Sequence, residues 1–318
     1  MTNTNTAGRR DPRHTHVAVL MGGWSSEREV SLASGKAVSE ALRGRGFKVT
    51  PIDVKPNIGW VLEELKPDVA FNALHGRWGE DGCMQGALES MGLPYTHSGV
   101  LASALAMNKQ ISKALFAKAG IPVAPGSVVA VEDLLRGKGL HPPCVVKPVD
   151  DGSSVGVHLV MRPGELPAEQ LQEQAELFKG KALVETYIPG RELTCAVMDE
   201  VALGVLEIVP HGGFYDYSSK YDEGGSQHIC PADLPYQVYQ QVQEYALMAH
   251  KALGCRGVTR ADFRYNEEAG EDGKLYLLEV NTQPGMTPTS LLPDIARQAG
   301  HSFADLVTWM VNDASTGR

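Results

Sequence analysis

The sequence predicts an α/β fold at the N-terminus, built on a parallel sheet, followed by a longer region of the α+β class. Over about the first 97 residues, short apolar runs that stop at turn residues alternate with helical patterns, which is typical of a parallel sheet with right-handed crossovers. After residue 98, strand patterns follow one another without this alternation. One of them, the apolar run 275–278, is followed at once by Glu279 and Asn281.

In the N-terminal region we expect three strands and a first helix. The strands are short apolar runs bounded by turn residues, at 17–21, 48–54 and 69–74. Ser26 and Glu29 have the spacing of a capping box, and the helical pattern that follows stops near Gly44. This predicts an α/β domain over residues 17–97, preceded by a flexible tail of residues 1–16.

The rest of the chain is expected to form a central domain, residues 98–184, and a C-terminal domain, residues 185–318. A single long helix is predicted over 100–119, because the pattern is not interrupted before Gly120. Further helices are predicted at 168–179, 236–253 and 303–312, and strands at 144–148, 157–161, 182–188, 192–199, 201–209, 257–265 and 275–281. The aperiodic segment 211–234 is longer than ordinary loops and is expected to be a lid.

The bulk composition excludes several classes of protein. A formal net charge of −9 is unfavourable for a nucleic-acid-binding protein, which would show a basic patch. No apolar run approaches the roughly 18 residues of a membrane span, and the first sixteen residues lack the apolar core of a secretory signal. Five scattered cysteines are typical of free thiols in a reducing compartment. We therefore expect a cytoplasmic protein.

The strand near the C-terminus carries the most informative chemistry. Because side chains alternate along a strand, Glu279 and Asn281 project from the same face. A buried carboxylate there is costly unless it is paired or holds a cation. Together with Asp262, these side chains offer only hard oxygen ligands, which suit Mg²⁺, and Mg²⁺ held by a few carboxylates usually accompanies the phosphates of a nucleotide. The segment indicates an ATP-dependent enzyme.

A lysine within a predicted strand, Lys147, gives a second indication. It needs an anionic partner if it points inward, and the glycine-containing loop 152–156 that follows could cradle phosphates with its N–H groups. The same loop matches G-x-S-x-G, the nucleophile elbow of serine hydrolases. That interpretation requires a helix after the loop, whereas residues 157–161 have the pattern of a strand, so it is disfavoured.

Three further side chains each have two interpretations. Glu27, near the start of the first helix, either places favourable charge at the helix N-terminus or binds a substrate ammonium at the carboxyl edge of the sheet. His75 follows a strand at the same edge, where a structural role is the alternative. Arg260 shares a strand face with Asp262, and it either stabilises charge during phosphoryl or acyl transfer or forms a salt bridge with Asp262.

Taken in order, five segments resemble the D-alanine–D-alanine ligase family of the ATP-grasp superfamily. They are GGWSSEREVSL at 22–32, HGRWGEDG at 75–82, GSSVG at 152–156, FYDYSSKY at 214–221 and NTQPGMTPTSL at 281–291. The likeness extends from Val17 to the C-terminal helix. It implies a Rossmann-like N-terminal domain followed by a two-part ATP-grasp fold.

The resemblance implies roles for the residues that match the family's motifs at the nucleotide. Lys109 and Lys147 would contact the phosphates of ATP, with Glu185 near the adenine and Glu192 near the ribose. Two Mg²⁺ ions, for which Mn²⁺ is an alternative, would be held by Asp262, Glu279 and Asn281.

The resemblance also implies roles at the substrates. Glu27 would bind the ammonium of the first D-alanine, and His75 would lie near its carboxylate. Arg260 and the backbone N–H of Gly285 would stabilise the tetrahedral oxyanion. The carboxylate of the second D-alanine would be anchored by Ser290 and Leu291. The two loops over the site would be joined by Ser153, Lys220 and Tyr221.

The implied reaction is the ATP-dependent joining of two D-alanines through an acyl phosphate, which supplies a peptidoglycan precursor. A homodimer is implied as well, with no nucleic acid and no membrane as partner. D-Lactate as acceptor is disfavoured by Lys220 and Tyr221, where the lactate-using relatives have histidine, and D-serine differs from D-alanine only by a hydroxyl. A non-catalytic ATP-binding module is disfavoured, because the metal and phosphate residues are all present. Trp78 and Gln283 depart from the glycine and serine of many relatives.

Overall fold

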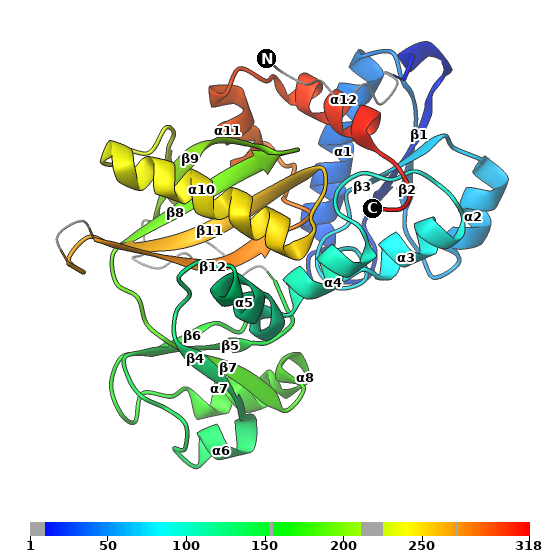
Figure 1. The fold of residues 1–318 in the computed structure, drawn as a ribbon. Helices are drawn as coiled ribbons and strands as arrows, with labels where there is room; N and C mark the ends of the chain where they lie inside the picture. Colours follow the sequence, from blue (N-terminus) through cyan, green and yellow to red (C-terminus); the bar gives the residue numbers. More distant parts are fainter. Residues whose placement is uncertain (1–9, 153–154, 211–224, 271–272) are drawn as a thin grey trace.

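The computed structural model describes residues 10–152, 155–210, 225–270 and 273–318 (Figure 1). The N-terminal part is a parallel sheet with strand order β2-β1-β3. Its strands are β1 (His16–Met21), β2 (Lys48–Asp53) and β3 (Val69–Asn72). The helices between and after them are α1 (Arg28–Gly44), α2 (Ile58–Leu65) and α3 (Cys83–Ser90). Because β1 and β3 are buried on both faces, their sequences are apolar runs, not alternating patterns.

Two antiparallel sheets follow. The smaller has the order β4-β7-β5-β6 and is formed by β4 (Gly126–Ala130), β5 (Cys144–Pro148), β6 (His158–Val160) and β7 (Lys181–Thr186). The larger has the order β10-β9-β8-β11-β12 and is formed by β8 (Arg191–Met198), β9 (Val201–Pro210), β10 (Ser226–Ile229), β11 (Val258–Asn266) and β12 (Lys274–Asn281). These strands confirm those predicted after residue 98, and β4 and β10 are additional.

Helices connect and cover these sheets. Short helices accompany the smaller sheet: α6 (Val131–Leu135), α7 (Ala168–Glu173) and α8 (Ala175–Phe178). The larger sheet is covered by α10 (Tyr236–Leu253), and α5 (Lys109–Lys118) lies between the two sheets (Figure 1). The remaining helices are α4 (Val100–Met107), α5 (Lys109–Lys118), α11 (Leu291–Gln298) and α12 (Phe303–Asp313). Throughout the described ranges, no helix is long and apolar enough to cross a membrane.

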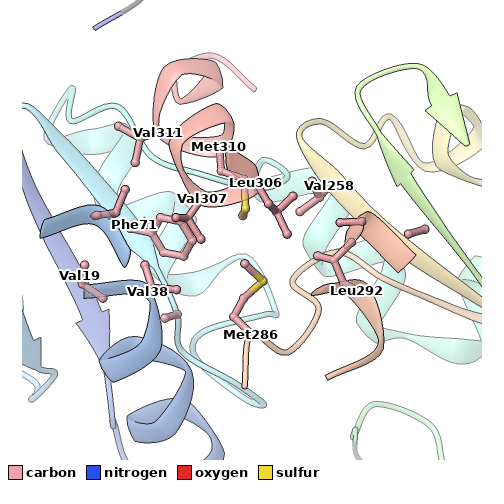
Figure 2. Packing of buried hydrophobic residues seen from close by; sticks show 14 of the residues in the cluster. Val19, Val38, Phe71, Val258, Met286, Leu292, Leu306, Val307, Met310 and Val311 are labelled. Carbon is pink, nitrogen blue, oxygen red and sulfur yellow. The ribbon is translucent and has the colours of Figure 1, made fainter. Parts of the chain in front are cut away.

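One hydrophobic core joins the first and last thirds of the chain. Figure 2 shows Val19 and Phe71 of the parallel sheet facing Val307 of α12, with Leu292 of α11 on the opposite side of the cluster. All four side chains are inaccessible to solvent. Burial of such side chains contributes roughly 1.5–3 kcal/mol each. The C-terminal helix therefore holds the parallel sheet against the larger antiparallel sheet, at the edge where the candidate site lies.

Three predictions about helices need correction. The helix predicted over 100–119 is two helices, because Asn108 has an extended backbone and its side chain accepts a hydrogen bond from the N–H of Ile111 at 3.0 Å. The pattern at 168–179 is likewise divided, at Gln174. The capping box of Ser26 and Glu29 does not form: α1 begins at Arg28, and Ser25 accepts the N–H of Glu27 at 3.2 Å.

Parts of the expected tail and of the expected lid form regular structure in the described residues. Arg10 donates hydrogen bonds to the carbonyls of Val311, Asn312 and Ala314, at 2.6, 2.9 and 2.7 Å, so it caps the end of α12. Residues 10–16 are thus not a tail: they include a short 3₁₀ helix, Pro12–His14, and the start of β1. In the predicted lid, residues 226–229 form β10, and residues 211–224 lie outside the described part.

The cap at Asn108 gives a stability prediction. Replacing Asn108 by alanine removes the acceptor for the N–H of Ile111 and should lower the free energy of unfolding by about 1 kcal/mol. Urea denaturation of Asn108→Ala beside Gln110→Ala, an exposed position on the same helix, measures this loss. Equal stability of the two variants would show that the cap does not stabilise α5.

Candidate active site

A buried carboxylate, Asp262, is the centre of a cluster formed by three adjacent strands. Thr194 on β8 donates to its Oδ1 at 2.6 Å, and Asn281 on β12 donates to its Oδ2 at 2.9 Å. Arg260, two residues earlier on β11, donates to both oxygens at 2.9 and 2.8 Å. The register places Asp262 opposite Glu279. The predicted trio of Asp262, Glu279 and Asn281 is therefore brought together, and the salt bridge between Arg260 and Asp262 is formed.

The donor atoms of this cluster fit Mg²⁺. Two carboxylates and one amide offer hard oxygen ligands, and Mg²⁺ usually takes one or two carboxylates and completes its shell with water and phosphate oxygens. In the described part of the chain, no group of three or more His, Cys, Asp or Glu side chains could hold a metal ion. Asp262, Glu279 and Asn281 are too few to enclose a metal ion by themselves, so water and phosphate oxygens would have to complete its coordination.

A cleft of about 940 Å³ lies between the two antiparallel sheets and opens onto this cluster. Its charged lining is Lys109, Lys147, Asp151, Glu185, Glu192, Asp262, Arg264 and Glu279, and its apolar lining includes Ala124, Val145, Val157, Ile188 and Leu278. Within this cleft, the apolar side chains suit a base, and the lysines Lys109 and Lys147 suit phosphates. Leu278 faces it because the register between β11 and β12 shifts after Asp262.

Two buried lysines bind Glu185 at the wall of this cleft. Lys147 Nζ lies 2.5 Å from Glu185 Oε2, and Lys113 Nζ pairs with the other carboxylate oxygen. Lys113 also donates to the carbonyl of Ala124 at 2.7 Å. Burial lowers the pKa of Lys147 to about 8 and that of Lys113 to about 7. Lys113 was missed by the sequence analysis, although it lies one helical turn after Lys109 on α5.

Lys109 connects the glycine loop to the carboxylate cluster. Its Nζ lies 3.3 Å from Glu279 Oε2 and also donates to the carbonyl of Asp151. Its backbone N–H bonds the carbonyl of Val149 at 2.9 Å. Lys109 is thus the first residue of α5, directly after the break at Asn108, and it lines the cleft.

Arg264 is a second charged residue that the sequence analysis missed. It donates to the carbonyls of Ile188 and Gly190 at 3.1 and 2.8 Å, and its Nη1 lies 3.3 Å from Glu192 Oε2. Arg264 thus joins β11 to the segment that connects the two antiparallel sheets.

A second cavity, of about 650 Å³, adjoins the first, and Gly152 and Glu279 line both. It brings together the side chains expected at the substrates: Glu27, His75, Arg260, Ser290 and Leu291, with Gly285 beside them. The side chains of Ser290 and Leu291 lie at the start of α11, where Ser290 Oγ accepts the N–H of Thr287 at 2.9 Å. A Cβ on Gly285 would lie 2.8 Å from that oxygen, so any larger residue would force the side chain of Ser290 to move.

The buried His75 and the partly buried Glu80 form a pair that lines this cavity. His75 is 4% exposed, and its Nδ1 lies 3.1 Å from Glu80 Oε1, while its Nε2 lies 3.0 Å from Ser34 Oγ. Burial lowers the pKa of His75 and raises the pKa of Glu80 to about 8, so both side chains are largely neutral near pH 7. Glu80 was missed by the sequence analysis. Its position within the segment 75–82, five residues after His75, was the available signal.

Glu27 is buried against two loops, one containing Gly76 and the other containing Gly152. It is 4% exposed, and a Cβ added to Gly76 or Gly152 would lie 2.5 or 3.4 Å from its Oε2. The carboxylate is therefore at the meeting point of the loops after β1, β3 and β5. This placement brings together three segments that are far apart in the sequence.

Gln283, which departs from the family pattern, fits its position in the structure. Gln283 is buried and donates to the carbonyl of Leu74, so it fastens the segment after β12 to the end of β3. Ser153, Lys220 and Tyr221 lie outside the described residues, and their roles stay predictions. The serine-hydrolase interpretation of the loop is wrong, because residues 158–160 form β6, antiparallel to β5, in place of the required helix.

A parallel-sheet domain followed by two antiparallel sheets that enclose a lysine-lined cleft defines an ATP-grasp protein. Family comparison is more specific. Residues 16–68 and 62–98 match the model described as D-ala D-ala ligase N-terminus, and residues 115–312 match D-ala D-ala ligase C-terminus. The chain belongs to the D-alanine–D-alanine ligase family.

Individual relatives agree over nearly the full length. A D-alanine–D-alanine ligase B of Mesorhizobium japonicum is 56% identical over 94% of this chain and 98% of its own length. D-alanine–D-alanine ligases of Methylorubrum populi and Agrobacterium fabrum are each 57% identical, over 95% and 94% of this chain and 99% and 98% of their own lengths. The crystal structure of the Bacillus anthracis D-alanine–D-alanine ligase complexed with ATP is 33% identical, with a TM-score of 0.76 over 94% of this chain and 96% of that one.

The raised pKa of Glu80 gives a pH-dependent prediction. The pKa of this carboxyl group is higher in the folded protein than in the unfolded chain. The free energy of unfolding of the protein therefore falls as the pH rises between the two pKa values, from about 4.5 to about 8. Glu80→Gln keeps a neutral side chain of the same shape. The melting temperature of Glu80→Gln should match that of the wild type near pH 4.5 and exceed it above about pH 8.

Thermal denaturation followed by circular dichroism across this pH range measures the difference. Glu63→Gln, an exposed position on α2, serves as the control and should show no such trend. A constant offset between Glu80→Gln and the wild type at every pH would contradict a raised pKa for Glu80.

Proposed function

We propose that the protein joins two D-alanines to D-alanyl-D-alanine and converts ATP to ADP and phosphate. The observation that carries the proposal is the junction of two cavities at the cluster of Asp262, Glu279 and Asn281. A nucleotide cleft lined by lysines meets a smaller polar cavity suited to amino acids. Family membership and the ATP complex of the Bacillus anthracis relative support the same reaction.

In the nucleotide cleft, the apolar side chains would enclose the adenine, and Lys109 and Lys147 would contact the phosphates. Glu185, held by Lys113 and Lys147, would face the adenine, and Glu192, held by Arg264, would face the ribose. Asp262, Glu279 and Asn281 would hold Mg²⁺, or Mn²⁺ as an alternative, which supplies positive charge to the phosphates when bound.

In the second cavity, the carboxylate of Glu27 would bind the ammonium of the first D-alanine. A carboxylate oxygen of this D-alanine then attacks the γ-phosphorus of ATP, ADP leaves, and an acyl phosphate of D-alanine results. The uncharged His75 and Glu80 border this site, so they line it without adding net charge beside the substrate carboxylate.

The second D-alanine would be anchored by its carboxylate at Ser290 and Leu291, at the N-terminus of α11. Its amine attacks the acyl carbon, phosphate leaves, and the peptide bond forms with loss of a proton. Arg260 and the N–H of Gly285 line the cavity where the tetrahedral oxyanion develops, and such fixed donors act most strongly in a water-excluding site. Ser153, Lys220 and Tyr221 would complete the site by joining the loops above it.

Three further proposals follow from this function. Because ATP is the proposed phosphoryl donor, we place the reaction in the cytoplasm, where it supplies a peptidoglycan precursor. The family resemblance supports a homodimer. Light scattering coupled to size-exclusion chromatography measures the oligomeric state directly.

Phosphate release from ATP and Mg²⁺ tests the proposed function. D-Alanine, L-alanine, D-serine and D-lactate are compared as substrates, and products are identified by mass spectrometry. Release that depends on D-alanine, with D-alanyl-D-alanine as product, is expected. Folded protein that binds ATP but releases no phosphate with D-alanine would refute the proposal.

Lys147→Met should reduce kcat/KM for ATP by about 10²–10³-fold, because one fixed cation at a developing charge contributes several kcal/mol. Lys118→Met, at an exposed lysine in the last turn of α5, should leave kcat/KM unchanged. Similar activities of the two variants would show that Lys147 does not contact the nucleotide.

A further inference from the structure

Two exposed tryptophans meet beside the proposed D-alanine site. Trp24 lies in the loop between β1 and α1, and Trp78 lies in the loop between β3 and α3. Their ring centroids are 6.0 Å apart with an interplanar angle of 42°, a tilted arrangement within the range of favourable aromatic pairs. The side chains remain 48% and 38% exposed. The contact therefore joins two loops and is not part of a hydrophobic core.

The two loops carry the residues proposed to hold the first D-alanine. Glu27 follows Trp24 by three residues, and Trp78 lies between His75 and Glu80, whose side chains are 3.1 Å apart. Both tryptophans line a small hollow that has His75 as a further wall. Any change in the distance between the loops would thus displace Glu27 relative to His75 and Glu80.

Polar contacts at the base of the loops show how closely they fit. Ser25 donates to the carbonyl of His75 at 2.7 Å and accepts the N–H of Glu27 at 3.2 Å. A Cβ on Gly76 would lie 2.5 Å from the carboxylate of Glu27. The tryptophan pair acts at the outer end of the same junction, where Arg77 places its guanidinium 4.7 Å from the ring centroid of Trp78.

Trp78 occupies this position at a conformational cost. Its φ is +74°, in the left-handed region that a bulky side chain rarely adopts and that glycine adopts freely. Such strain persists only where surrounding contacts hold it, and it is concentrated at functional sites. The carbonyl of Trp78 accepts the N–H of Met84 at 3.0 Å, and Glu80 donates its N–H to the carbonyl of Gly76 at 3.0 Å, so the turn itself is firmly held.

We propose that the contact between Trp24 and Trp78 is a positioning element for the first D-alanine, which keeps Glu27 at its working distance from His75 and Glu80. The inference rests on the proposed function, because it takes these three residues as the walls of that site. D-Alanine is small and offers few contacts, so its binding depends on fixed geometry more than that of ATP does. Trp78 is a positioning residue and does not touch the substrate.

The variant Trp78→Gly separates this role from a general contribution to folding. Glycine relieves the positive φ, so the melting temperature should be equal to or higher than that of the wild type. The KM for the first D-alanine should nevertheless rise by about 10- to 100-fold, because displaced binding groups lose much of their effect. The KM for ATP should not change, since the tryptophans do not line the nucleotide cleft.

Matched variants sharpen the test. Trp24→Ala should raise the same KM, and the double variant should be no worse than either single one, because both remove one contact. Trp24→Phe keeps an aromatic ring and should restore most of the affinity. Trp60→Ala, at a tryptophan on α2 that is 60% exposed, should behave as the wild type.

An unchanged D-alanine KM in Trp78→Gly would overturn the inference. Equal increases in KM for ATP and D-alanine, with a lower melting temperature, would also overturn it, because they indicate general damage. If the wild type itself does not use D-alanine, the proposed function fails, and this inference fails with it. The wild-type assay therefore distinguishes the two cases before any variant is compared.

Discussion

The buried carboxylate of Asp262 is the constraint on which the rest of the site depends. A lone charge at this depth would be strongly unfavourable, and it persists because Thr194, Arg260 and Asn281 donate to it from three adjacent strands. Those donors fix the register of β8, β11 and β12 at their polar ends. Once the register is set, Glu279 faces both cavities and Arg260 faces the second one, where we propose that they act on the metal and on the oxyanion.

The larger cleft likewise contains buried charged groups that depend on a partner of opposite charge. Lys147 and Lys113 are buried, which disfavours their charged forms and lowers their pKa values, yet they share the carboxylate of Glu185. Buried lysines are costly without an anionic partner, and we propose that the phosphates of ATP supply further negative charge there. The hydrophobic core around Val307 includes Met286 and Leu291, which flank or line the second cavity, so the packing of the C-terminal helix and the geometry of that cavity are linked.

Much of this arrangement could be predicted from sequence, for reasons that particular residues illustrate. The strands at Glu279 and Lys147 have apolar neighbours that mark burial, and their polar residues stand out against that background. The break at Asn108 could not be predicted, because a single cap residue within an apolar helical pattern is ambiguous until the tertiary fold selects it. Glu80, Lys113 and Arg264 were missed since each acts through a partner distant in sequence or across a turn. The pairing of Trp24 with Trp78 has no local signal at all.

The most direct test of this account is the dependence of ATP affinity on Mg²⁺, measured by isothermal titration calorimetry with a non-hydrolysable ATP analogue. The wild type and Asp262→Asn are compared over a Mg²⁺ series, since asparagine keeps the size of the side chain and removes its charge. The account predicts that affinity rises with Mg²⁺ in the wild type and that the rise is lost in Asp262→Asn. An equal rise in both proteins, or no rise in the wild type, would contradict the assignment of this carboxylate as the centre of the site.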